Sequence, residues 1–148
     1  MRMWRRLRAR PREIDQARAS LLLQEDDVSA VKAPIAQSKC IVGVDAAKTS
    51  YMTTAGTDWE AAGDGMWVKR IYEDAVRAES TMLFRMDPGA YSPPHSHDAF
   101  EQVYVLEGSF YDEDRLVKAG EFCARSPGAM HSASSDDGAL MLVVYTRA

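Results

Sequence analysis

The chain has 148 residues, of which 46% are hydrophobic, and its formal net charge is −4. This length fits a single domain with its own core, and the apolar content is close to the globular average. No apolar run approaches the roughly 18 residues that a membrane helix needs, so we expect no membrane partner. The two cysteines, Cys40 and Cys123, form no C-x-x-C motif and are too few for a disulfide framework. A reduced, cytoplasmic setting is the simplest expectation.

The first 20 residues are basic, with seven arginines against Glu13 and Asp15. A basic arm can bind nucleic acid or an anionic membrane surface. This one lacks the apolar stretch of a secretion signal and a series of aromatic residues for base stacking. We therefore interpret it as a solvated extension and expect no nucleic-acid partner.

Residues 12–24 place Ile14, Ala17 and Leu21 at helical spacing, which predicts a short helix. The predicted organisation is a basic N-terminal extension with this helix over residues 1–45, followed by one domain over residues 46–148.

Short strands and turns dominate the rest of the chain. Two early candidates, 40–44 and 50–54, precede predicted strands at 66–72, 80–86, 100–107, 115–118, 121–125, 129–132 and 140–145. The acidic run 112–114 is interpreted as a solvated hairpin tip. Many short strands at regular spacing predict an all-β sandwich or barrel.

The most informative stretch, residues 89–108, contains His95, His97 and Glu101 before an apolar run that ends at Gly108. On one strand these three positions have the same parity, so their side chains would share a face. Imidazole and carboxylate groups in this spacing suit Zn, Fe, Mn, Ni or Cu. The third and last histidine, His131, follows a Ser-Pro-Gly turn.

These residues resemble the two motifs of the cupin superfamily, also called RmlC-like. In the first motif a glycine, His-x-His, a glutamate and a second glycine follow at the family's spacing. The second, Gly120 to His131, is similar but looser: Ser126 and Ser135 replace the usual proline and asparagine. The resemblance implies a double-stranded antiparallel β-barrel, the cupin jelly roll.

By the same resemblance, His95, His97, Glu101 and His131 bind one divalent metal ion per chain. Fe(II) is the expected ion, with Zn, Mn and Ni as alternatives. Two simpler interpretations stay open: the histidines could be hydrogen-bonded core residues, or a metal could serve stability alone.

Residues 67–148 are similar to two cupin subgroups. One comprises small Fe-dependent dioxygenases of diketones and hydroxyacetophenones; the other is the cupin half of zinc-dependent anti-sigma factors. Residues 1–65 contain no histidine and only Cys40, so the separate zinc domain of the anti-sigma proteins has no counterpart there. The favoured hypothesis is an Fe(II) dioxygenase acting on a small keto, diketo or hydroxyaryl ketone compound. The alternative is a non-catalytic zinc-binding sensor or regulatory module, and an isomerase or lyase is a weaker third.

An oxygenase would need an apolar pocket for its small-molecule substrate. The candidates for its lining are Phe84, Tyr91, Phe122 and Met130, although each could equally be barrel core. Tyr104 has the opposite parity to the ligands and is not a candidate. Cupins commonly dimerise by pairing sheets of two subunits, so we also predict a homodimer. The apolar strand at 40–44 could form its interface.

Overall fold

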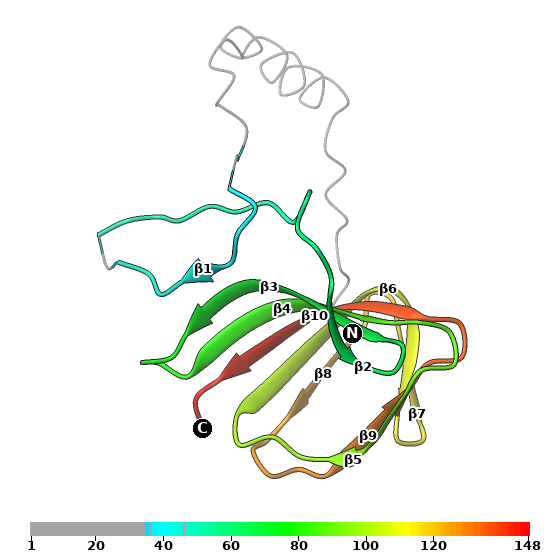
Figure 1. Ribbon diagram of the computed structural model, residues 1–148. Coiled ribbons are helices and arrows are strands. Elements are labelled where there is room, and N and C mark those ends of the chain that lie inside the picture. The colour runs from blue at the N-terminus through cyan, green and yellow to red at the C-terminus, as the bar shows by residue number, and fades with distance from the viewer. Residues whose placement is uncertain (1–34, 36, 46) are drawn as a thin grey trace, which may run out of the picture. The chain divides into compact units, whose positions relative to one another are not determined.

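The computed structural model describes residues 35, 37–45 and 47–148 (Figure 1). The predicted helix within 12–24 and the basic arm lie outside the described residues. Within the described part every regular element is a strand. The strands are β1 (Ile41–Val42), β2 (Glu60–Gly63), β3 (Met66–Asp74), β4 (Glu79–Met86), β5 (Tyr91–His95), β6 (Phe100–Asp112), β7 (Arg115–Lys118), β8 (Phe122–Arg125), β9 (His131–Ser134) and β10 (Ala139–Thr146). In this same part, no helix is long and apolar enough to cross a membrane.

The strands of the domain form two sheets that share the long strand β6 (Figure 1). The larger has the order β1-β3-β4-β10-β6, with β2 added to β3 and β8 added to β6. The smaller joins β5, β9, the second half of β6 and β7. Every pairing is antiparallel except that of β1 with β3. The predicted double-stranded antiparallel β-barrel is confirmed.

Strand alternation places the core between the two sheets. On β6, Val103 and Val105 are buried, whereas the alternate residues Tyr104 and Leu106 are exposed. The neighbouring strand β10 repeats the pattern and buries Ala139, Met141 and Val143. Each large aliphatic side chain buried in this way contributes roughly 1.5–3 kcal/mol. The apolar alternation therefore fixes which face of β6 and β10 meets the barrel interior.

The predictions for residues 50–54 and for the end of the central strand need correction. Residues 50–54 form no strand, although their composition favours one. Instead of a ladder of hydrogen bonds to a partner strand, their backbone makes an isolated hydrogen bond, from the Thr53 N–H to the Gln37 carbonyl oxygen at 2.6 Å. Strand β6 also continues past Gly108, where the sequence predicted its end. A register shift between Leu140 and Met141 marks a bulge there, and Gly108 adopts a positive φ of 69° that lets the strand pass into the second sheet.

Candidate metal centre

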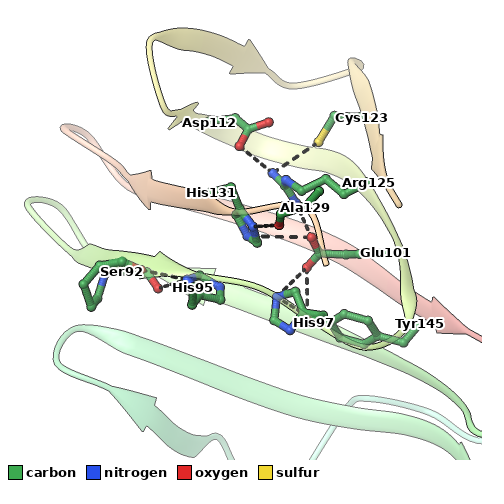
Figure 2. A network of polar contacts seen from close by, with 11 residues as sticks. Ser92, His95, His97, Glu101, Asp112, Cys123, Arg125, Ala129, His131 and Tyr145 are labelled. Carbon is green, nitrogen blue, oxygen red and sulfur yellow. Dashed lines mark hydrogen bonds and ion pairs between the residues drawn. The ribbon is translucent and has the colours of Figure 1, made fainter. Parts of the chain in front are cut away.

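The three histidines converge from different elements (Figure 2). His95 ends β5, His131 begins β9, and the two are directly opposite each other in the ladder. His97 lies in the connection between β5 and β6. Its carbonyl accepts the Gly128 N–H at 2.8 Å, which ties this connection to the turn before His131. The local backbone thus brings both sequence motifs to one point.

The predicted reason for this convergence, shared parity on one strand, is wrong. His95, His97 and Glu101 do not share a face through parity on one strand, because β5 ends at His95 and β6 begins at Phe100. They meet because the two strands belong to facing sheets whose interior sides both line the barrel. Of the three, only Glu101 lies on the same strand as Val103 and Val105, and it is buried with them.

Backbone carbonyls orient two of the imidazoles. Nδ1 of His95 lies 2.7 Å from the Pro93 carbonyl oxygen, and Nδ1 of His131 lies 3.4 Å from that of Ala129. A carbonyl can only accept, so these contacts favour the tautomer with the proton on Nδ1. Nε2 then keeps its lone pair for a ligand, the usual arrangement of a metal-binding histidine.

The ring centroids of His95 and His131 are 4.2 Å apart. The ring centroid of His97 lies 4.9 Å from that of His95 and 5.3 Å from that of His131. One nitrogen from each histidine can be chosen so that all three lie within 4.8 Å of one another. Burial lowers the pKa of His97 and of His131, with Glu101 opposing the shift in both and Arg125 reinforcing it. Neutral imidazoles are the form that binds metal. The cluster therefore fits a divalent transition-metal ion, as its donor type favours Zn, Fe, Ni or Cu.

Glu101, the fourth predicted ligand, lies beside the cluster in a network of its own (Figure 2). One carboxylate oxygen, Oε1, accepts the Tyr145 hydroxyl at 2.8 Å and lies 3.6 Å from Nε2 of His97. The other, Oε2, accepts from Nη1 of Arg125 and lies 3.9 Å from Nε2 of His131. The structure thus brings all four predicted residues together, and it gives Glu101 two protein partners that the motif does not specify.

Arg125 and Tyr145 are the residues that sequence reasoning missed. Glu101 pairs with Arg125 on β8 and with Tyr145 on β10, so the three form one line across the sheet. Arg125 also contacts Asp112 through Nη2 at 2.8 Å. Burial alone would lower the pKa of Arg125, but the carboxylates of Asp112 and Glu101 outweigh this effect, so the pKa is raised. Burial and the charge of Glu101 raise the pKa of Tyr145, so its hydroxyl stays protonated.

This network also corrects the interpretation of the acidic hairpin tip. Asp112 is the last residue of β6, and its side chain is only 21% exposed where it meets Arg125. Only the two acidic residues after it form the turn to β7.

A cavity of about 300 Å³ opens at the histidines. This volume is at the lower end of ligand pockets, so it suits a small molecule. The polar side includes the histidines, Glu101, Arg125 and Tyr145. The apolar side includes Phe84, Met86, Val103, Phe110, Met141 and Val143.

Of the four predicted pocket residues, only Phe84 lines this cavity. Tyr91, Phe122 and Met130 lie at the surface, with 55%, 57% and 62% of each residue exposed. Alternation explains Phe122, because Cys123 and Arg125 on the same strand are half-buried and leave it on the outer face. Tyr91 begins its strand, and its neighbour Ser92 takes the inward position.

Comparison with known proteins supports this architecture. An RmlC-like cupin from Shewanella frigidimarina superposes with a TM-score of 0.60 and 20% identity, over 68% of this chain and 93% of its own. KdgF from Halomonas sp. gives 0.57 and 22%, over 68% and 96%. A Methylibium petroleiphilum protein provisionally named an acetylacetone dioxygenase gives 0.61 and 15%, over 67% and 77%. At these identities the similarity concerns the fold alone.

No curated protein matches the sequence. Residues 47–148, more than half of the chain, match the family described as the ChrR Cupin-like domain. This match, together with the barrel fold and the histidine cluster, shows that the chain belongs to the ChrR-like cupin family.

Proposed function

We propose that this cupin is a metal-dependent oxygenase that acts on a small keto, diketo or hydroxyaryl ketone compound. The observation that carries the proposal is the position of the histidine cluster, at the polar end of a mainly apolar cavity of about 300 Å³. A structural metal site needs no such space, whereas a catalytic one keeps positions open for a ligand.

The proposed ligands are His95, His97 and His131, with Glu101 as the adjacent fourth candidate. Bound Fe(II) would supply Lewis acidity and one-electron chemistry with O₂. The chain itself contributes an apolar wall and the neutral hydroxyl of Tyr145, which donates to Glu101. Phe84 and Val143 are among the apolar residues that line the cavity, and its volume of about 300 Å³ favours a compact substrate.

A second function also has an observation in its favour. Oxygens of Glu101 lie 3.6 and 3.9 Å from nitrogens of His97 and His131, so a fourth protein donor is within reach. Four protein donors around zinc make a closed structural site. A non-catalytic zinc-binding module, acting as a sensor or regulator, is therefore the alternative.

Oxygen consumption distinguishes the two. The full chain, stripped of metal and reconstituted with Fe(II), is placed in an O₂ electrode with a panel of diketones and hydroxyaryl ketones. We expect uptake that depends on substrate, that Ser135→Ala preserves and that His97→Ala abolishes. Ser135 is a suitable control because it is fully buried and bonds to the Ser109 carbonyl, away from the histidines. Stoichiometric zinc in the purified protein, with no uptake after iron reconstitution, would support the module instead.

A further inference from the structure

We propose that Ala62 limits the size of the molecules that enter the cavity, and that ligands reach the metal centre past strand β2. The inference rests on the proposed metal centre and adds to it the route by which a substrate enters. No sequence motif marks this residue, because its role depends on how β2 pairs with β3.

Ala62 is both a surface residue and a residue of the cavity wall. It is exposed, as are the other three residues of β2. Among the described residues that line the cavity, Ala62 is the only exposed one, and the others are buried or half-buried. The cavity therefore meets the solvent beside Ala62.

A bulge in β2 directs Ala62 toward the cavity. Ala61 pairs with Trp67 on β3. The next pair along the ladder is Gly63 with Met66, so Ala62 has no partner on β3. A bulge of this kind re-aims a side chain, and such bulges are common at the rims of barrels.

Strand β2 lies directly against the cavity wall. A Cβ built on Gly63 would lie 2.5 Å from Cε of Met66, and Met66 is itself a lining residue. The absence of a side chain at Gly63 thus lets the strand approach the wall closely. Ala62 then supplies only a methyl group at the rim, which leaves a wider passage than a larger side chain would.

The segment that contains Ala62 is held at both ends. Before β2, the ring of Trp59 contacts Nζ of Lys69 at 4.9 Å and Cζ of Arg85 at 4.8 Å, measured to the ring centroid. These are cation–π contacts with residues of β3 and β4. After β2, the Gly65 carbonyl accepts the Asp87 N–H at 2.8 Å. A rim held in this way selects ligands by the size of the side chain at position 62.

The test compares two ligands that offer Co²⁺ the same type of nitrogen but differ in size, imidazole and 4-phenylimidazole. The metal-free full chain is loaded with Co²⁺, and stopped-flow absorbance of the Co²⁺ bands gives the association rate constant of each ligand. Neither ligand is a ketone, so the result does not depend on the proposed oxygenase activity.

We expect Ala62→Leu to slow 4-phenylimidazole about 10-fold and to leave imidazole unchanged. A 10-fold change in rate corresponds to about 1.4 kcal/mol in the barrier, within the range for added methylene groups in a confined space. Ala61→Leu is the matched control, because Ala61 is also exposed on β2 but lies outside the cavity lining. It should change neither rate. Ala62→Gly, which widens the passage, should speed the entry of 4-phenylimidazole.

Three results would overturn the inference while the metal centre stands. An unchanged rate for 4-phenylimidazole in Ala62→Leu would place the entrance elsewhere, for example beside the half-buried His97. Equal slowing of both ligands would show that position 62 does not select by size, and equal slowing in Ala61→Leu would show that the effect is not specific to the rim. Absence of Co²⁺ binding by the unmodified chain would refute the metal centre and, with it, the proposed route to that centre.

Discussion

Replacement of Gly108 by alanine tests how the barrel positions its metal-binding strands. Gly108 has a φ of 69°, and a Cβ built there lies 2.1 Å from the Gly138 carbonyl oxygen and 3.2 Å from Cα of Ala139. The left-handed conformation costs an alanine about 1–2 kcal/mol. Overpacking against backbone adds about 1–3 kcal/mol, because the obstructing atoms cannot rotate away. We therefore expect Gly108→Ala to lower the free energy of unfolding by about 2–5 kcal/mol.

Gly128→Ala is the matched control for Gly108→Ala. Its φ is 78°, similar to that of Gly108, but no atom lies within 4 Å of the added Cβ. It should lose only the conformational part, about 1–2 kcal/mol. Urea unfolding of the two metal-free variants measures the difference in their free energies of unfolding, provided that their m-values are equal. Equal losses in the two variants would refute the close contact between Gly108 and Gly138, and with it the argument that β6 needs a glycine to enter the second sheet.

Three further predictions concern the site and the assembly. First, acidification from about pH 7.5 to about pH 5.5 should lower the free energy of unfolding of the metal-free protein. Histidines in the unfolded chain protonate near a pKa of about 6.5, whereas burial lowers the pKa of His97 and His131 in the folded protein and keeps them neutral. Urea titrations at several pH values measure this, and a stability that is constant or rises on acidification would contradict it. Second, Tyr145→Phe removes the donor 2.8 Å from Glu101 and should cost about 1.5–3 kcal/mol, the range for a hydrogen bond to a charged group; an unchanged urea midpoint would show that Glu101 does not depend on this hydroxyl. Third, the homodimer stays a prediction, and light scattering that finds a stable monomer at high concentration would refute it.

The sequence predicted much of the fold because its strand pattern is regular. The prediction at 66–72 lies within β3, Met66–Asp74, and that at 80–86 lies within β4, Glu79–Met86. The failure at 50–54 has a physical cause, since β-propensity describes how side chains fit a pleated surface and not which partner strand is available. Strand 40–44 is reduced to Ile41–Val42, which pairs with β3 in the parallel direction.

Residue types and motifs predicted the histidine cluster. The sequence did not reveal which residues on neighbouring strands lie beside it, because that depends on strand register. The cluster was predicted from the His-x-His spacing together with the resemblance to the two cupin motifs, which added His131. Arg125 and Tyr145 lie 24 and 44 residues after Glu101, and only the pairing of β8 and β10 with β6 reveals that they flank it. Three of the residues predicted to line an apolar pocket do not reach the cavity, because the face of the strand or turn on which each lies decides this.

Metal content is the most direct test of the account. The full chain and three variants are purified without chelator or added metal and analysed for transition metals. We expect about one divalent ion per chain in the unmodified protein and in Ser135→Ala, and most of it lost in His97→Ala and His131→Ala, because each of these removes one of the three nitrogens that converge within 4.8 Å. Full metal retention in both histidine variants would contradict the assignment of the site.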